Sequence, residues 1–221
     1  MSHKVHPLAY RLGINANWKA RWFDEKRYSE RVREDVSIRE YLSKKLRSAG
    51  LESIEIERTA NRIIIIINTS RPGLIIGRSG AGAESIKKDL EKILRRVVLK
   101  YGGDKKLSEI KIEIREVKNP ESFGNVVGLS IAEQLERRMP FRRVMKKAME
   151  RIMSNKEVEG AKIVLAGRLG GADMSRRESI KEGRMPRNTL RSNLELAKNE
   201  AYTTYGVIGV KVWIYKGEKL E

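Results

Sequence analysis

Cysteine is absent from all 221 residues of this chain, which excludes disulfide bonds, thiol catalysis and zinc sites built on cysteine. Histidine is scarce, because His3 and His6 are the only two and both lie near the N-terminus. A catalytic triad or a histidine metal site would need further histidines that the chain does not have. We expect no catalytic residues, no metal and no cofactor.

Long apolar runs are also missing, since no stretch approaches the roughly 20 residues that span a bilayer. The first 23 residues lack acids and carry four cations, a composition that would suit a transit peptide. Pro7, Gly13 and Trp18 interrupt an amphipathic helix there, so we interpret the segment as a basic arm that is ordered or bound to RNA. We expect a cytoplasmic protein with no membrane partner.

Positive charge, in contrast, is abundant. The chain has 47 Lys and Arg against 29 Asp and Glu, a formal net charge of +18 and an isoelectric point near 10.1. The excess is spread along the chain, with 12 cations against 6 acids in residues 1–50 and 12 against 7 in residues 161–221. Because such a field attracts polyanions, nucleic acid is the first partner that we expect.

Residues 72–80 (PGLIIGRSG) give the strongest local signal, and they follow a run of five isoleucines at 63–67. Glycines at 77 and 80 leave room for the backbone and a helix N-terminus to approach phosphate oxygens. A plain structural turn is the alternative role, and single-stranded DNA is the alternative ligand. We predict that RNA binds the loop made by Gly77, Arg78, Ser79 and Gly80.

Two other phosphate-binding motifs do not fit this loop. A P-loop closes with Gly-Lys-Ser or Gly-Lys-Thr, whereas the chain continues with Ala83 and Glu84. A dinucleotide-binding fingerprint that starts at Gly80 would need a third glycine where Ser85 stands. A nucleotide cofactor is therefore not expected here.

Hydrophobic periodicity around the loop predicts six elements. Ser37 and Glu40 have the spacing of a capping box that starts a helix, and this helix runs to Gly50. An amphipathic helix follows the loop and ends near Gly102 and Gly103. The remaining elements are strands at 54–57, 63–67 and 110–115 and a helical turn at 73–76.

The chain after Pro120 predicts a second domain. Its expected elements are helices at about 121–138 and 140–154 and strands at 161–166, 207–215 and around 194–196. Residues 167–191 are rich in glycine and arginine, and we predict them to be irregular.

The predicted fold class is α+β. We divide the chain into a basic N-terminal arm (1–37), an RNA-binding domain (38–118) and a C-terminal α/β domain (119–221). In the last domain two helices should pack on a small mixed or antiparallel sheet.

The helix after Pro140 is amphipathic, with one apolar and one strongly basic face. Like charges at helical spacing repel each other unless a polyanion is present. We interpret the basic face as a nucleic-acid contact; a solvated face of a packed helix and a membrane-surface helix are the alternatives. The basic face consists of Arg142, Arg143, Lys146, Lys147 and Arg151.

The order helix-strand-strand-helix-helix-strand, with Gly-x-x-Gly between the second and third helices, resembles the second, prokaryotic type of KH domain. The resemblance covers about residues 38–118. It implies that the loop clamps the backbone of about four nucleotides while an apolar groove holds the bases.

Further segments make the chain similar to the family of bacterial small-subunit ribosomal protein three. They are 4–7 (KVHP), 11–14 (RLGI), 134–138 (QLERR), 141–143 (FRR), 167–173 (GRLGGAD), 182–186 (EGRMP), 189–191 (TLR) and 203–214 (TTYGVIGVKVWI). These segments cover nearly the whole chain in the family's order. The chain departs from the family pattern at Arg177, Ser179, Arg187 and Asn188, which puts individual contacts in doubt.

The resemblance implies a structural protein in the head of the small ribosomal subunit, with ribosomal RNA and messenger RNA as ligands and no small-molecule substrate. Small-subunit proteins ten and fourteen would be neighbours in the head, and proteins four and five would share the channel through which messenger RNA enters. Matched positions imply that incoming messenger RNA meets Arg142, Arg143, Lys146 and Lys147, where the family aids unwinding. Ribosomal RNA would contact Lys4, Arg11, Arg168, Arg176, Arg177, Arg184 and Arg191.

Two other classes of function are less consistent with the sequence. A KH-type transcription or RNA-processing factor would carry a second KH copy or an attached OB-type barrel, and neither pattern is present. An RNA-modifying enzyme or nuclease would need clustered carboxylates or a nucleophile. Asp173, Glu178 and Glu182 are better interpreted as charge balance within a basic stretch.

Overall fold

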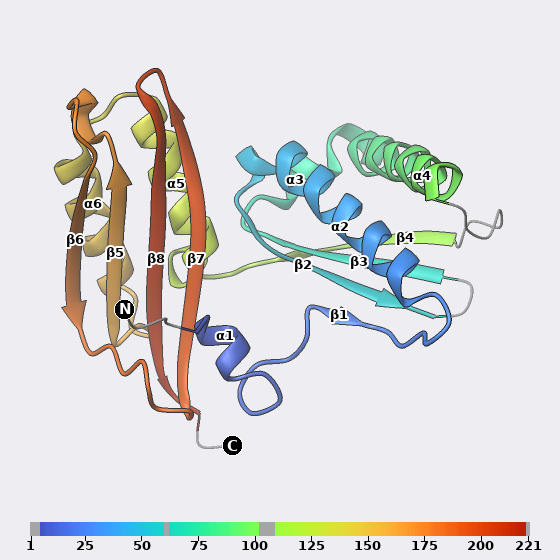
Figure 1. The fold of residues 1–221 in the computed structure, drawn as a ribbon, viewed down its shortest axis with the longest axis horizontal. Coiled ribbons are helices and arrows are strands. Elements are labelled where there is room, and N and C mark those ends of the chain that lie inside the picture. The colour runs from blue at the N-terminus through green and yellow to red at the C-terminus, as the bar shows by residue number, and fades with distance from the viewer. Residues whose placement is uncertain (1–4, 60–61, 102–108, 220–221) are drawn as a thin grey trace. The chain divides into compact units, whose positions relative to one another are not determined.

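The computed structural model describes residues 5–59, 62–101 and 109–219. The chain divides into two compact units (Figure 1): Lys19–Lys118, called the loop unit here, and Met1–Trp18 with Asn119–Glu221, called the C-terminal unit. Each unit has nine more cations than acids, 25 against 16 in the loop unit and 22 against 13 in the C-terminal unit. The division differs from the predicted arm of residues 1–37, because the first 18 residues group with the C-terminal unit.

The loop unit is a four-stranded sheet with helices on one face (Figure 1). Its elements are β1 (Ala20–Arg21), α2 (Tyr28–Lys45), η1 (Arg47–Ala49), β2 (Leu51–Arg58), β3 (Arg62–Thr69), α3 (Pro72–Ile76), η2 (Arg78–Gly80), α4 (Ala81–Tyr101) and β4 (Glu109–Glu116). The strand order is β1-β2-β3-β4; β2 and β3 are antiparallel, while the β1–β2 and β3–β4 pairs are parallel. The predicted order of the six main elements and the α+β class are confirmed, and β1 is an addition.

The five isoleucines of β3 are shared between the two faces of the sheet. Three face the helices and are at most 2% exposed. Ile64 and Ile66 face the other way, and Ile66 lies in register between Glu55 of β2 and Glu113 of β4. Ile66 is nevertheless only 1% exposed.

Helix α2 begins at Tyr28, so the capping box predicted at Ser37 is wrong. The hydroxyl of Ser37 donates to the carbonyl oxygen of Arg33 (2.9 Å) within the helix, an alternative open to serine in mid-helix. The start of the helix is instead held by Asp24, whose carboxylate accepts a hydrogen bond from the backbone N–H of Arg27 (3.0 Å). This bond lowers the pKa of Asp24.

A buried ion cluster around Arg58 ties α2 to β2. The guanidinium of Arg58 contacts Glu34 Oε2 at 2.6 Å and Asp35 Oδ1 at 2.5 Å, and all three side chains are at most 10% exposed. The indole Nε1 of Trp22 donates to the second carboxylate oxygen of Asp35 (2.8 Å). Since Trp22 and both acids precede residue 38, the fold of the loop unit needs residues that the sequence analysis assigned to the arm.

Replacing Arg58 by Leu should lower the free energy of unfolding by about 3–5 kcal/mol, because two carboxylates would stay buried without a cation. Urea unfolding of the full chain, followed by circular dichroism, measures the loss. Arg62→Leu is the matched control: Arg62 pairs with Glu109 at 3.0 Å, but these side chains are 66% and 63% exposed. Its loss should stay below about 1 kcal/mol, and equal losses in the two variants would contradict the anchoring role of Arg58.

The C-terminal unit contains α1 (Pro7–Tyr10), η3 (Pro120–Ser122), α5 (Gly124–Glu136), α6 (Phe141–Met153), β5 (Gly160–Gly167), η4 (Leu169–Gly171), β6 (Arg176–Gly183), β7 (Ser192–Thr203) and β8 (Gly206–Glu218). Its sheet is antiparallel throughout, in the order β6-β5-β8-β7. Helices α5 and α6 lie on one face of this sheet (Figure 1).

The core of this unit comes from alternate residues of the strands. Ile163 and Leu165 of β5 and Val212 and Ile214 of β8 are completely buried against the helices. Their neighbours in sequence point to the opposite face of the sheet. From α6 the core receives Val144, Met145, Ala148, Met149 and Ile152.

Residues 167–191, predicted to be irregular, contain strand β6. This strand pairs with β5 along its whole length, from Gly160↔Gly183 to Gly167↔Arg176. The prediction failed because Ile180 is the only large apolar residue of β6. An edge strand is held in the sheet by backbone hydrogen bonds to one neighbouring strand, so polar side chains do not prevent pairing.

Candidate nucleic-acid interface

The Gly-x-x-Gly loop connects α3 directly to α4. Three of its residues have left-handed backbone conformations: Gly77 (φ 69°), Ser79 (φ 51°) and Gly80 (φ 83°). Such a conformation is uncommon for a residue with a Cβ atom and costs about 1 kcal/mol or more. Conformations of this kind gather at functional segments, and in this loop one falls on Ser79.

Close packing against the first turn of α4 explains the need for glycine. A Cβ atom on Gly77 would lie 3.1 Å from the backbone nitrogen of Gly82. A Cβ atom on Gly82 would in turn overlap the carbonyl oxygen of Ile75. The loop backbone is therefore held against the N-terminus of α4, where the helix dipole favours negative charge.

The surface of the loop combines a cation with exposed apolar side chains. Arg78 and Ser79 are exposed, and Arg78 makes no ion pair with any residue that the structure describes. Leu74 and Ile76 are 64% and 42% exposed, while Ile75 between them is buried. No role for Leu74 and Ile76 was predicted from the sequence, although apolar residues in the turn before Gly-x-x-Gly indicate a surface for bases. Nucleotide bases could pack on them.

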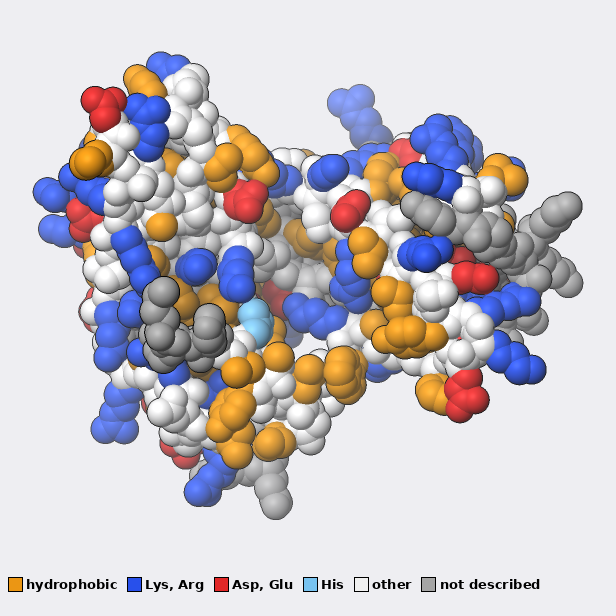
Figure 2. All heavy atoms as spheres, in the orientation of Figure 1, with side chains coloured by type: hydrophobic (Ala, Val, Ile, Leu, Met, Phe, Trp, Pro, Cys, Tyr) orange, Lys and Arg blue, Asp and Glu red, His pale blue; other side chains and the backbone are white. Residues whose placement is uncertain are grey.

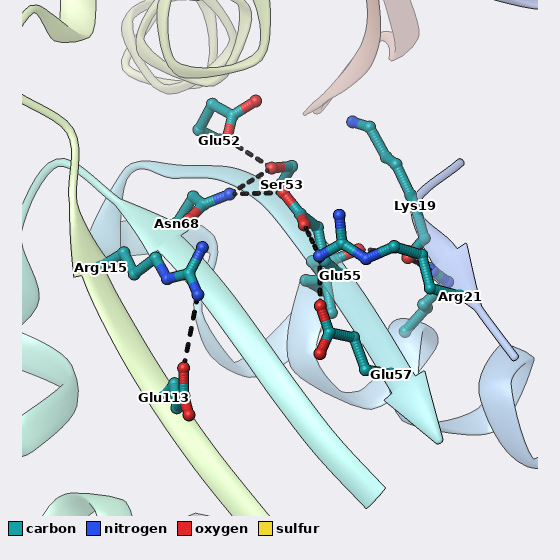
Figure 3. A network of polar contacts seen from close by, with 11 residues as sticks. Lys19, Arg21, Glu52, Ser53, Glu55, Glu57, Asn68, Glu113 and Arg115 are labelled. Atoms are coloured by element: carbon teal, nitrogen blue, oxygen red, sulfur yellow. Dashed lines mark hydrogen bonds and ion pairs between the residues drawn. The ribbon is translucent and has the colours of Figure 1, made fainter. Parts of the chain in front are cut away.

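The open face of the sheet in the loop unit is less suited to RNA, because Arg21, Lys111 and Arg115 are paired with carboxylates (Figure 3). Arg21 contacts Glu55 at 2.8 Å and Glu57 at 2.5 Å, and Lys111 contacts Glu113 at 3.0 Å. The hydrogen bond to Glu57 raises the pKa of Arg21, and the one from Lys111 lowers the pKa of Glu113. In this unit the loop is the better candidate for an RNA contact.

Helix α6 has the two faces that the sequence predicts. The five core residues of its apolar face are at most 8% exposed, whereas Arg142, Arg143, Lys146 and Lys147 are all exposed. Within the described residues, the last three make no ion pair. The buried face fixes the helix, so the cations stand at defined positions for a polyanion.

The structure joins this basic face to one arginine of the glycine-arginine stretch. Arg142 and Arg176 contact the same carboxylate oxygen of Glu178, at 3.9 and 3.8 Å. Both guanidinium groups also lie over the ring of Phe141, at 5.7 and 5.3 Å from its centre. Arg176 therefore belongs with the α6 surface, which the sequence did not indicate.

Comparison with known families and proteins identifies relatives of the whole chain. A family model described as a KH domain matches residues 37–122, and one described as the C-terminal domain of ribosomal protein S3 matches residues 131–214. Small ribosomal subunit protein uS3 of Oleidesulfovibrio alaskensis is 46% identical over 222 residues, which cover 100% of this chain and 98% of the relative. The protein of that name from Caldicellulosiruptor saccharolyticus is 47% identical over 221 residues, covering 100% and 94%. The chain belongs to the ribosomal protein S3 family.

Membership of this family confirms several expectations from the sequence. A member of the S3 family is a structural protein of the small ribosomal subunit and not an enzyme. The predicted KH domain is confirmed. The expected localisation on cytoplasmic ribosomes is confirmed as well, since these relatives are ribosomal proteins of bacteria.

The structure contradicts the prediction that Arg11 contacts RNA, because its side chain is only 1% exposed. Its guanidinium donates to the carbonyl oxygens of Thr189 (2.7 Å) and Arg187 (3.0 Å) and to Ser192 Oγ (2.8 Å). Burial lowers the pKa of Arg11. These acceptors lie just before β7 and at its first residue, and Nη2 of Arg11 reaches all three. Arg11 therefore links the N-terminal segment to the start of β7 through hydrogen bonds.

The other cations predicted to contact ribosomal RNA do not form one site. Lys4 lies outside the described residues. Arg168 folds back on its own turn, where it donates to the carbonyl oxygen of Ala172 (2.9 Å) and contacts Asp173 (3.2 Å). The remaining three are exposed on separate elements: Arg177 on the face of the sheet opposite α6, Arg184 after β6 and Arg191 before β7.

No helix in residues 5–59, 62–101 or 109–219 is long and apolar enough to cross a bilayer. In the same ranges, no three His, Asp or Glu side chains gather in a way that could hold a metal ion.

Replacing Arg11 by Leu should lower the free energy of unfolding by about 2–4 kcal/mol, because inward-facing acceptors would lose a charged donor. The salt dependence of RNA binding should not change, since a buried cation neutralises no phosphate. Thermal unfolding and binding titrations over a range of salt test both statements. Arg191→Leu, an exposed neighbour of the same segment, should leave stability within about 0.5 kcal/mol; a reduced salt slope in the Arg11 variant would restore an RNA role for this residue.

Proposed function

We propose that this chain binds the small-subunit ribosomal RNA and helps to line the channel through which messenger RNA enters the ribosome. The observation that carries the proposal is the basic face of α6. Three exposed cations without described partners stand on a helix whose opposite face is fixed in the core.

Such a face suits messenger RNA because phosphate contacts carry affinity without reading sequence. The channel must accept every message, so a row of fixed cations is more useful there than contacts to base edges. Arg142 and Arg176 extend the row, and Glu178 and Phe141 hold them in place. The movement of the ribosome drives the unwinding, and the cations favour the separated strand.

The Gly-x-x-Gly loop is proposed as a second RNA surface. Bare backbone, the N-terminus of α4 and Arg78 offer donors and positive charge to phosphates, and Leu74 and Ile76 offer an apolar surface to bases. A KH fold inside an assembly can also serve only to contact neighbouring molecules without gripping RNA in its loop. The variant with Arg78 and Ser79 changed to Asp distinguishes RNA binding from this role.

The protein neighbours are part of the same proposal. The family resemblance implies contacts with small-subunit proteins ten and fourteen in the head and with proteins four and five at the messenger RNA channel. Their positions on this chain would follow from crosslinking within assembled subunits.

Changing Arg78 and Ser79 to Asp should weaken binding of single-stranded RNA by the full chain about tenfold or more, since two negative charges would face the phosphates. Fluorescence anisotropy with a labelled oligonucleotide measures the affinity. The matched control is Ser43→Asp with Lys44→Asp, which makes the same charge change on two exposed residues of α2. If both double variants lost affinity equally, the loop would be only a turn.

Changing Arg142, Arg143 and Lys146 to Gln should leave subunit assembly intact and slow translation through stable messenger RNA hairpins. The expected cause is the loss of up to three phosphate contacts with the unwound strand. Ribosomes that carry the variant would be timed on messages with and without a hairpin. A control with Lys44, Lys88 and Lys156 changed to Gln removes the same charge from exposed positions elsewhere. Normal speed through hairpins would remove α6 from the proposed channel.

A further inference from the structure

The face of the C-terminal sheet opposite α5 and α6 carries a second set of cations. Register places Leu196, Trp213, Lys162 and Lys181 in one row across β7, β8, β5 and β6. The next row begins with Lys198 and Lys211. These residues alternate with the core residues of the same strands, so they point away from the helices.

A groove of about 830 Å³ runs over this face beside α1. Six Lys and Arg residues, one of them the buried Arg11, line it together with one tryptophan, and no carboxylate is among its described lining residues. Figure 2 looks onto this side of the unit and shows Lys and Arg side chains across it. The lining residues that matter here are Lys162, Arg177, Arg187, Lys198, Lys211 and Trp213.

The arrangement of these cations is unfavourable in the free protein. Lys198 and Lys211 are direct partners across β7 and β8, and Lys162 and Lys181 are direct partners across β5 and β6. Like charges opposite each other destabilise a sheet, and neither Lys198 nor Lys211 makes an ion pair with a described residue. A bound polyanion would remove this repulsion. In contrast, Arg21 and Lys111 on the open sheet face of the loop unit are paired with glutamates.

Trp213 gives the groove a flat aromatic surface between the cations. It is partly exposed, and Lys162 Nζ lies 5.9 Å from the centre of its ring. Leu196 lies on its other side in the sheet, and Tyr10 of α1 also lines the groove. Aromatic rings flanked by cations on a sheet face are the combination that binds unpaired bases and their phosphates.

We propose that this sheet face binds a single-stranded RNA segment, with a base stacked on Trp213 and phosphates held by Lys162, Lys198 and Lys211. The segment extends the proposed RNA-binding function to a surface separate from the Gly-x-x-Gly loop and from α6. An acidic protein segment is the rival occupant. It fits less well, because β5 and β8 have a strand on each side and offer no free backbone edge, and exposed ion pairs alone contribute little. A stacked base and neutralised phosphates contribute more.

Photocrosslinking tests the proposal on the full chain. A single-stranded 12-mer that contains 5-iodouridine is irradiated with the protein, and the trypsin-digested product is analysed by mass spectrometry. Cleavage after Lys211 and Lys216 releases the peptide of residues 212–216 (VWIYK), which contains Trp213. We expect RNA on this peptide, with a yield that saturates as the RNA concentration rises.

Lys162→Gln with Lys198→Gln keeps both cleavage sites and removes two of the proposed phosphate contacts. The apparent affinity at the peptide should fall roughly tenfold or more, and its slope against the logarithm of salt concentration should fall by about 1.4. The control Lys44→Gln with Lys156→Gln removes the same charge from exposed positions outside the groove and should change the affinity less than about twofold.

Three outcomes would overturn the proposal: no RNA on the peptide, equal effects of the two double variants, or displacement of the RNA by a glutamate 12-mer at concentrations below those of a competing RNA 12-mer. The last outcome would assign the groove to an acidic protein segment. The peptide reports on this face alone, so the loop variant Arg78→Asp with Ser79→Asp should leave its yield unchanged. Failure at the peptide would therefore not count against the loop or against α6.

Discussion

Helices cover each of the two sheets on one face only, and much of the molecule follows from this constraint. One set of alternate residues in each strand must be apolar to build the core, which leaves the other set free to carry charge. Strand β8 shows both sets: Val212 and Ile214 are completely buried, while Lys211 and Trp213 line a groove on the opposite face. The same strands therefore build the core and present charged surfaces.

The two units use the same excess charge differently. In the loop unit, Arg21 and Lys111 of the open sheet face pair with glutamates, and Arg58 is buried between two carboxylates. In the C-terminal unit, five exposed cations lack such partners among the described residues, and Arg11 is buried. The five are Arg143, Lys146 and Lys147 of α6 and Lys198 and Lys211 of the open sheet face. An arginine in a basic protein is thus a binding residue only where the fold leaves its charge exposed and unpaired. Net charge indicates the class of ligand, and burial and pairing select the surfaces.

The sequence predicted those parts of the fold that depend on local pattern. The isoleucine run became a central strand, Gly-x-x-Gly became a loop ahead of a long helix, and α6 kept its two faces, because each of these needs only periodicity or turn chemistry. The failures depended on distant partners. Helix α2 begins before the predicted position, and its early part contains Glu34 and Asp35, which contact Arg58 of β2. Strand β6 is held by its pairing with β5. Arg11 is buried against acceptors about 180 residues away in the sequence. No local pattern reports such contacts.

Several modest RNA surfaces on one chain can act together without any single deep site. A phosphate contact or a stacked base is worth a few kcal/mol at most, which alone gives weak binding. When one surface is bound, the others meet the same RNA at a high effective concentration, so their contributions multiply instead of competing. A structural protein of an RNA particle benefits from this arrangement, because the proposed phosphate contacts on both units would together resist dissociation while each contact stays exchangeable. The repulsion between Lys198 and Lys211 acts in the same direction. It slightly destabilises the free protein, and the proposed RNA-bound state is favoured because bound phosphates would remove it.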